Sequence, residues 1–111
     1  MSESAIQQER LQAFLEEMWS DNTEEEAELL WKRRVLRTPQ YAADALVALN
    51  ATIAQPPANL REILEEHGQI NLMRRPDHDT VTPYTFEETV AWLKAMTARF
   101  RTLYDEGQAA K

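Results

Sequence analysis

The sequence predicts an all-α protein, a compact bundle of four to five helices with one irregular loop at about residues 69–83. Three observations favour this fold class. Apolar residues recur at helical spacing along most of the chain. The two glycines and five prolines fall where helix ends are expected. The stretches TEEE and TFEE match the capping box that begins a helix. The chain has 111 residues, so we expect residues 1–111 to form a single helical domain.

The first two helices are predicted from apolar spacing and from the charges near helix ends. The first covers residues 4–19, approximately, and carries an apolar stripe made of Leu11, Phe14, Leu15 and Met18. The second follows Thr23, which forms a capping box with Glu26. It begins with acids and ends with bases, the order that the helix dipole favours. The bases are Lys32, Arg33, Arg34 and Arg37.

Prolines mark both ends of the third helix, and a glycine marks the end of the fourth. Thr38 is expected to cap the third helix with Pro39 at its first position, and two consecutive prolines stop it. Its small apolar face predicts close contact with a neighbouring helix and consists of Ala42, Ala45, Leu46, Leu49 and Ile53. Asn59 is expected to cap a short helix over residues 60–67, and Gly68 to follow its C-terminus.

The irregular loop and the last helix complete the predicted fold. Ile70 and Leu72 are expected to pack inward from an extended connector, and one such run is too short to make a sheet. The last helix starts at the capping box of Thr85 and Glu88 and is expected to end at Gly107. Its buried stripe is predicted to contain Phe86, Val90, Leu93, Met96 or Thr97, Phe100, and Leu103 or Tyr104.

The net charge of −7 is concentrated at one end of the chain. Residues 1–30 hold nine acids and one base, a charge of −8, whereas residues 31–111 carry +1. An acidic end argues against nucleic acid or an anionic membrane as partner and fits a basic protein partner. The third helix, which would have to read DNA in a helix-turn-helix, contains no Lys or Arg, so DNA binding is rejected.

The absence of cysteine excludes disulfides, thiolate zinc sites and thiol nucleophiles. The first residues lack the basic and apolar regions of a signal peptide, and no apolar run is long enough to span a membrane. We therefore expect a cytoplasmic protein.

One group of candidate interaction residues surrounds the end of the first helix and the start of the second. Its acids are Glu16, Glu17, Asp21, Glu24, Glu25 and Glu28. Capping and solubility explain any one of them, but Glu16 and Glu17 would oppose the dipole of their own helix. A local rule broken without a structural gain indicates a functional surface. Trp19 lies among these acids and fits both an interface anchor and a core position.

The loop RRPDHDTVTPYTFEE, residues 74–88, holds the second group of candidates. Asp77 and Asp79 flank His78, which suggests a metal or acid–base site. Turn formation is the favoured interpretation, because aspartates bond the local backbone in turns and no converging set of further ligands is present. Arg74 and Arg75 fit a partner contact or an ion pair with the protein's own acids. No nucleophile elbow, phosphate loop or zinc motif occurs, so we expect no enzyme activity, no metal and no cofactor.

The stretch PDHDTVTPYTFEETVAWLK resembles bacterial immunity proteins, those of DNase-type colicins and, more loosely, those of contact-dependent growth-inhibition systems. The matching residues are Pro76, Asp77, Asp79, Pro83 and Trp92. The colicin family places paired tyrosines before this proline, whereas Arg74 and Arg75 stand there in this chain. The resemblance implies a small helical protein that binds a basic nuclease toxin through an acidic surface.

The sequence thus favours a non-enzymatic binding protein, an immunity protein that neutralises a cognate, basic, nuclease-like toxin. The expected contact residues are Glu16, Glu17, Trp19, Asp21, Glu24, Glu25, Glu28, Arg74, Arg75, Asp77 and Asp79. The first alternative is a small chaperone or adaptor for a phage or secretion-system protein, with an apolar groove lined by Met18, Met73 or Met96. The second is a small metal-dependent enzyme built on Asp77, His78 and Asp79.

Overall fold

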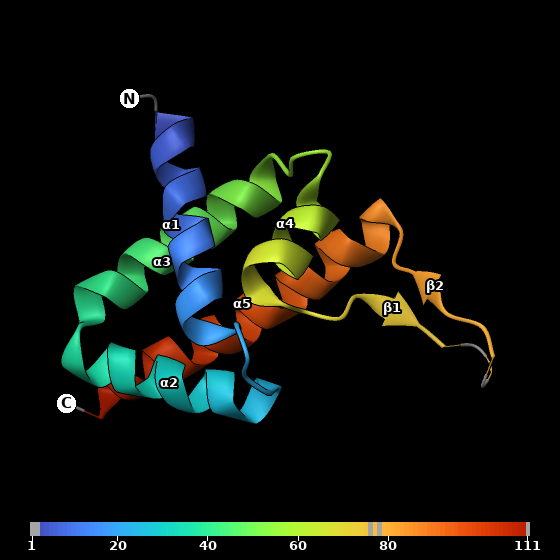
Figure 1. Cartoon of the computed structure of the whole chain (residues 1–111). Coiled ribbons are helices and arrows are strands. Elements are labelled where there is room, and N and C mark those ends of the chain that lie inside the picture. Colours follow the sequence, from blue (N-terminus) through green and yellow to red (C-terminus); the bar gives the residue numbers. More distant parts are fainter. Residues whose placement is uncertain (1–2, 76, 78, 111) are drawn as a thin grey trace.

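A computed structural model describes residues 3–75, 77 and 79–110 and confirms the all-α bundle (Figure 1). In these residues five helices are present: α1 (Glu3–Met18), α2 (Glu24–Arg37), α3 (Pro39–Ala54), α4 (Leu60–Gly68) and α5 (Phe86–Ala109). Two short strands, β1 (Met73–Arg74) and β2 (Thr82–Pro83), lie between α4 and α5.

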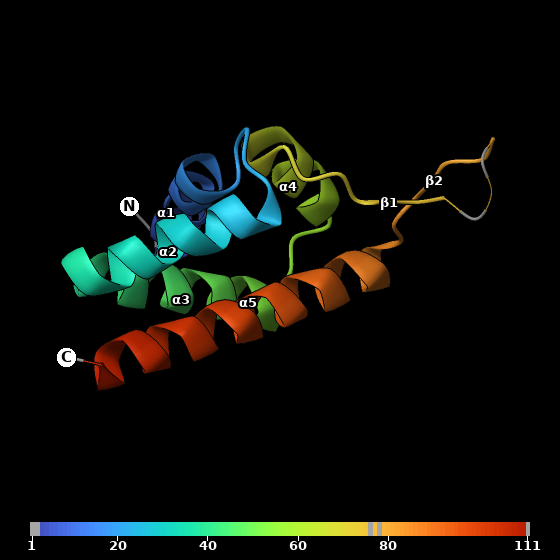
Figure 2. The same ribbon diagram turned by 90° about the horizontal axis from the view of Figure 1, so that it is seen from below.

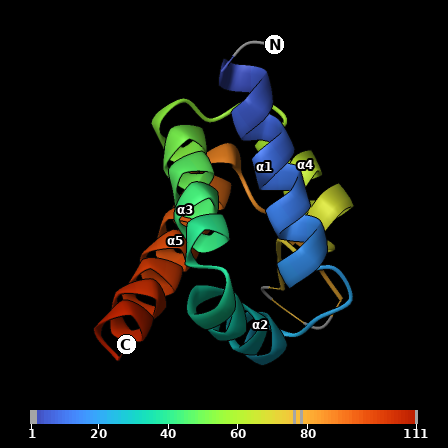
Figure 3. The same cartoon turned by 90° about the vertical axis from the view of Figure 1, so that its left-hand side faces the viewer.

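The helices form two layers. Figure 2 shows α1, α2 and α4 on one side of the molecule and α3 and α5 on the other. The third helix contacts both α1 and α5, and Figure 3 shows it between them. Its small residues permit this, since Ala42, Ala45 and Ala48 are all buried. The predicted close approach of α3 to its neighbours is therefore confirmed.

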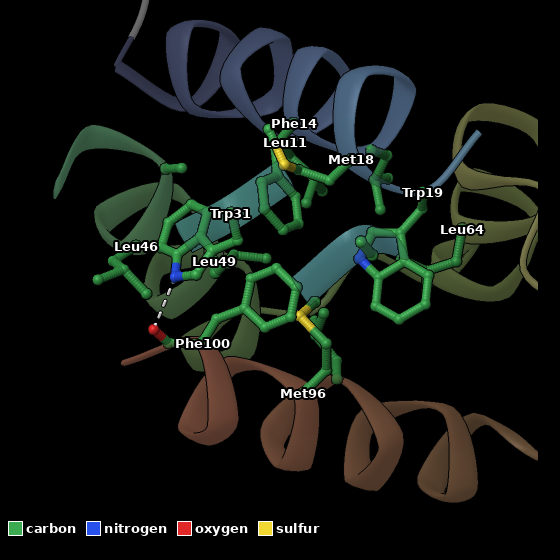
Figure 4. Packing of buried hydrophobic residues seen from close by; sticks show 14 of the residues in the cluster. Leu11, Phe14, Met18, Trp19, Trp31, Leu46, Leu49, Leu64, Met96 and Phe100 are labelled. Atoms are coloured by element: carbon green, nitrogen blue, oxygen red, sulfur yellow. Dashed lines mark hydrogen bonds between the residues drawn. The ribbon is translucent and has the colours of Figure 1, made fainter. Parts of the chain in front are cut away.

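An aromatic cluster occupies the centre of the core (Figure 4). Phe14 of α1 packs edge-on against Trp31 of α2 and Phe100 of α5, with ring centroids 5.7 Å apart in both pairs. The indole Nε1 of Trp31 donates a hydrogen bond of 2.8 Å to the Phe100 carbonyl. Leu49 of α3 and Leu64 of α4 belong to the same core, so all five helices contribute to it.

Both predicted capping boxes are present, whereas the two predicted single N-caps hold their positions without a side-chain hydrogen bond. Glu26 N–H donates to Thr23 Oγ1 at 3.2 Å, and Thr23 N–H donates to the Glu26 carboxylate at 3.0 Å. The same reciprocal pair begins α5. Thr38 and Asn59 stand at the N-cap positions of α3 and α4, as predicted, and Pro39 follows Thr38, but neither side chain makes a cap hydrogen bond. Thr38 Oγ1 instead donates to the Arg34 carbonyl at the end of the preceding helix.

Neither glycine occupies its predicted position, which was the residue just after the helix for Gly68 and the end of the last helix for Gly107. Gly68 is the last residue of α4, and the residue with the left-handed backbone is Gln69, whose φ is 53°. Gly107 lies inside α5, which continues to Ala109. A Cβ at position 107 would stand 2.5 Å from Val35 Cγ1 of α2. Gly107 is therefore needed for close contact between two helices, a requirement that a helix-end pattern does not reveal.

The irregular loop contains a small antiparallel ladder that the sequence did not predict. Met73 pairs with Pro83 and Arg74 with Thr82. Seven residues, 75–81, separate β1 from β2 in the sequence. The extended run before β1, considered alone, therefore did not predict a partner strand. β1 and β2, with the described residues between them, form an arm that extends away from the helices (Figures 1 and 2).

The apolar residues just before β1 and at the start of α5 were predicted to pack inward, and this prediction is partly confirmed. Leu72 is buried and Ile70 packs against the core from a partly buried position. The expected stripe of α5 is correct from Val90 onward, where Val90 packs against the core from a partly buried position. Phe86, however, is 43% exposed, and Thr89 is buried instead. The first turn of α5 reaches beyond the core, so its apolar residue faces solvent.

Candidate binding surface

The acidic end of the protein consists of the C-terminus of α1, the turn at residues 19–23 and the first turn of α2. Asp21 in this turn has a φ of 61°, a left-handed conformation that aspartate tolerates better than most residues. Its N–H donates to Gln69 Oε1 at 3.0 Å. The turn is therefore attached to the C-terminal end of α4, and the acids on both sides of it are held on one part of the surface.

Glu16 and Glu17 find partners on other helices. Glu16 Oε1 lies 2.9 Å from His67 Nδ1 of α4, and Glu17 Oε2 lies 3.1 Å from Arg34 Nη2 of α2. These pairs offset the unfavourable position of both acids at the end of α1. They are partly exposed, and such pairs contribute roughly 1 kcal/mol or less. Their placement thus has a structural explanation that the sequence did not reveal.

Arg34 is also held by an aromatic ring. Its guanidinium carbon lies 4.6 Å from the centroid of the Tyr41 ring, a cation–π geometry. Burial, followed by the nearby Glu17 carboxylate, raises the pKa of the Tyr41 hydroxyl. Tyr41 therefore stays neutral at physiological pH, and Glu17, Arg34 and Tyr41 join α1, α2 and α3 at this corner.

Glu28 and Glu26 are also engaged within the protein. The Glu28 carboxylate receives two bonds from Arg99 of α5, at 3.0 and 3.3 Å. Glu26 closes the capping box, and the hydrogen bond from the Thr23 backbone lowers the pKa of Glu26.

Of the acids at this acidic end, Asp21, Glu24 and Glu25 are exposed and form no ion pair within 4.0 Å with any described residue. We call these three residues the acidic triad.

Trp19 lies in the core and exposes 8% of its surface, which decides between the two positions that the sequence left open. Its ring stacks on Phe100 at 6.1 Å and meets Trp92 edge-on at 5.5 Å. One side of this group borders a pocket of about 220 Å³ between the start of α2 and α5. The lining residues are Trp19, Glu24, Trp92, Ala95, Met96, Arg99 and Phe100.

The candidate residues of the loop lie on the arm, apart from the acidic end in both Figure 1 and Figure 2. Arg74 Nε lies 3.1 Å from a Glu88 carboxylate oxygen, so Arg74 forms the ion pair with one of the protein's own acids that was one of its two predicted roles. Arg75 is exposed. Asp77 Oδ1 accepts hydrogen bonds from the N–H groups of Asp79 and Thr80, at 2.9 and 2.8 Å. Asp77 therefore forms the predicted turn.

The hydrogen bond with the Thr80 side chain, followed by those backbone bonds, lowers the pKa of Asp77. His78 lies outside the described residues, as does Pro76. Within residues 3–75, 77 and 79–110, no three His, Asp or Glu side chains converge as a metal site would require.

Two of the methionines suggested for a chaperone groove border pockets: Met96 lines the pocket between α2 and α5, and Met18 lines a second pocket beside Leu30 and Arg34. Met73 stands on the arm. A further cleft of about 440 Å³ lies between α1, α3 and α4. All of its lining residues are uncharged: Gln7, Gln8, Leu11, Val47, Ala51, Thr52, Gln55, Pro57 and Ile63.

Comparisons with known proteins give no relative. No family model matches the chain, and no curated protein and no solved structure is significantly similar to it. None of the described helices is long and apolar enough to cross a bilayer.

Proposed function

We propose that this protein is a non-enzymatic binding protein, an immunity protein that neutralises a basic, nuclease-like toxin through its acidic end. The observation that carries the proposal is the acidic triad. Its three carboxylates are exposed and unpaired, whereas the neighbouring acids are engaged with the protein's own basic side chains or caps. The dipole of α2 favours Glu24 and Glu25 in its first turn, but no cation among the described residues pairs with the triad, so its negative charge is available to a basic partner.

The proposed mechanism is electrostatic steering followed by occlusion. The excess negative charge within residues 1–30 attracts a basic surface and raises the association rate. The helices behind the triad are fixed by the tie between Asp21 and Gln69 and by the pair between Glu28 and Arg99. A toxin bound there would have its basic, nucleic-acid-binding surface covered, and this would block its activity without any chemistry by the immunity protein.

Neutralisation of the triad tests the proposal. A basic partner is first isolated by pull-down, and its association rate is then measured by stopped flow at several salt concentrations. Asp21→Asn, Glu24→Gln and Glu25→Gln together should slow association by about tenfold or more at low ionic strength and flatten its salt dependence. Glu66→Gln with Glu87→Gln is the control, since both residues are exposed acids outside the triad. If the two sets have the same effect, the triad does not guide binding.

The uncharged cleft between α1, α3 and α4 supports one alternative, the chaperone or adaptor. Val47 is 53% exposed at its edge, and an apolar helix of a client protein would fit such a groove. In this case Val47→Glu would abolish partner binding, and neutralisation of the triad would leave it unchanged. The two functions therefore give opposite results with the same pair of variants.

A further inference from the structure

Three arginines of α2 line a pocket beside the C-terminus of α1. The pocket has a volume of about 280 Å³, and we call it the arginine pocket. Its lining residues are Glu17, Met18, Leu30, Arg33, Arg34, Arg37 and Thr38. The lining residues that belong to α2 follow the spacing i, i+3, i+4, i+7, which places them on one face of the helix. In a protein with a net charge of −7, three bases around one pocket reverse the overall charge locally.

Two of the three guanidinium groups have no acidic partner. Arg33 and Arg37 are exposed and form no ion pair within 4.0 Å with any described residue. The ion pairs of the described part of the chain engage five other arginines, namely Arg34, Arg61, Arg74, Arg99 and Arg101. The dipole of α2 favours bases near its C-terminus, but it does not require them to surround a pocket. The charge of Arg33 and Arg37 is therefore available to a ligand.

The third arginine is held in position by the protein. Arg34 Nη2 donates to Glu17 Oε2 at 3.1 Å, and its guanidinium carbon lies 4.6 Å from the centroid of the Tyr41 ring. A guanidinium has five N–H donors, and the bond to Glu17 uses one of them. An ordered side chain loses less freedom when it binds a ligand, so Arg34 is prepared for a second acceptor.

We infer that the arginine pocket binds a phosphate monoester, a phosphoryl group carried on an apolar stem. Guanidinium groups match the geometry of phosphate oxygens, and they replace the backbone N–H groups of the phosphate loop that this chain lacks. Three arginines and one glutamate give the lining a net charge of +2. A phosphate monoester carries close to −2 at neutral pH and balances this charge, whereas a carboxylate carries only −1. Met18 and Leu30 supply apolar surface for the stem.

Two probes with the same aromatic ring test the preference for a dianion. They are phenyl phosphate and phenylacetate, and their affinities are measured by isothermal titration calorimetry at pH 7.5 and low ionic strength. We expect saturable binding of phenyl phosphate and an affinity for phenylacetate at least about tenfold lower, because the carboxylate forms fewer charge-assisted hydrogen bonds. Equal affinity for the two probes, or no saturable binding of phenyl phosphate, would overturn the inference.

Two pairs of matched variants locate the site. Arg33→Gln with Arg37→Gln removes the unpaired guanidinium groups and should weaken phenyl phosphate binding at least about tenfold. Arg10→Gln with Arg75→Gln removes the same charge from exposed arginines outside the lining and should leave the affinity within about twofold. All four side chains are exposed, so circular dichroism should show an unchanged fold. An equal loss in the two pairs would assign the binding to general charge and would contradict the pocket.

The phosphoryl group can belong to a small molecule or to a phosphorylated tyrosine of a protein. N-acetyl-O-phospho-L-tyrosinamide distinguishes the two sources, since it adds the backbone of a peptide to phenyl phosphate. An affinity about tenfold higher than that of phenyl phosphate would assign the pocket to a phosphorylated side chain. An equal or lower affinity would assign it to a small monoester.

The arginine pocket and the proposed function can fail separately. The acidic triad lies outside the lining of the pocket, so its neutralisation should not weaken phenyl phosphate binding. If the triad variant associates with the basic partner at the normal rate while phenyl phosphate still binds, the proposed function fails and the pocket stands. If phenyl phosphate does not bind while the triad variant slows association, the pocket fails and the proposed function stands.

Discussion

At the scale of single residues, the two buried tryptophans Trp19 and Trp31 differ in whether the indole N–H is used. Trp31 is fully buried and donates to the Phe100 carbonyl, whereas the N–H of Trp19 has no partner within the described residues. We expect Trp31→Phe to lower the free energy of unfolding by about 2–4 kcal/mol, through lost packing and one lost hydrogen bond. Trp19→Phe should cost about 1 kcal/mol less, since it loses packing alone. Urea unfolding of both variants measures the difference, and equal costs would show that the Trp31 bond contributes nothing.

The capping glutamates Glu26 and Glu88 give a prediction for acid stability. Hydrogen bonds from the Thr23 and Thr85 backbones lower the pKa of each below its ordinary value of 4.5. Their contribution to stability is therefore complete above pH 4.5 and is lost as the pH falls through the lowered values. Glu26→Gln with Glu88→Gln keeps an acceptor in each capping box but cannot be protonated, so stability should fall less steeply below pH 4.5.

Urea midpoints at pH 7 and in the acid range measure this slope. The control is Glu25→Gln with Glu87→Gln, which changes the neighbouring acids outside the capping boxes. The same reduction of the slope in both pairs would mean that general charge repulsion, and not the capping hydrogen bonds, sets the acid response.

At the scale of elements, Thr23 and Asn59 stand at the starts of helices with and without a side-chain cap. Thr23→Ala should destabilise the protein by about 1 kcal/mol, because the N–H of Glu26 loses its acceptor. Asn59→Ala should change the free energy of unfolding by less than about 0.5 kcal/mol, since its side chain makes no cap bond. Thermal unfolding followed by circular dichroism compares the two, and a larger loss for Asn59→Ala would contradict the observed caps.

The contact between α2 and α5 predicts an unusual response at Gly107. Gly→Ala inside a helix normally stabilises by roughly 1 kcal/mol. Here the new Cβ would stand 2.5 Å from Val35 Cγ1, and overpacking typically costs about 1–3 kcal/mol. We therefore expect Gly107→Ala to destabilise the protein. In a background of Val35→Ala the same change should be neutral or stabilising, and a double-mutant cycle measures this coupling. Destabilisation of equal size in both backgrounds would exclude the contact as its cause.

At the scale of the whole molecule, one hydrophobic core joins all five helices. Its centre, formed by Phe14, Trp31 and Phe100, joins α1, α2 and α5. Loss of any one helix would expose this centre, so we expect a single cooperative unfolding transition. Helix content by circular dichroism and the environment of the tryptophans by fluorescence should change at the same temperature. Two separated transitions would contradict the single domain that the sequence predicts.

The sequence by itself determined the helical class, a bundle of four to five helices and the starts of α2 and α5. Each of these depends on local physical rules, namely apolar spacing, the break at Pro56 and Pro57, and capping boxes that close within four residues. The turn at Asp77 was predictable for the same reason, because its hydrogen bonds reach only two and three residues along the chain.

Only the tertiary structure decided the features that join distant parts of the chain. It paired Glu16 with His67 and Glu17 with Arg34, and so explained two acids that break a local rule. It placed Trp19 in the core and formed a pocket against Trp92, a residue 73 positions away. The physical reason is that a side chain's spacing specifies which face of a helix it occupies, but not which neighbour covers that face. That choice depends on how five helices pack together, and it decides which acids remain free to meet a partner.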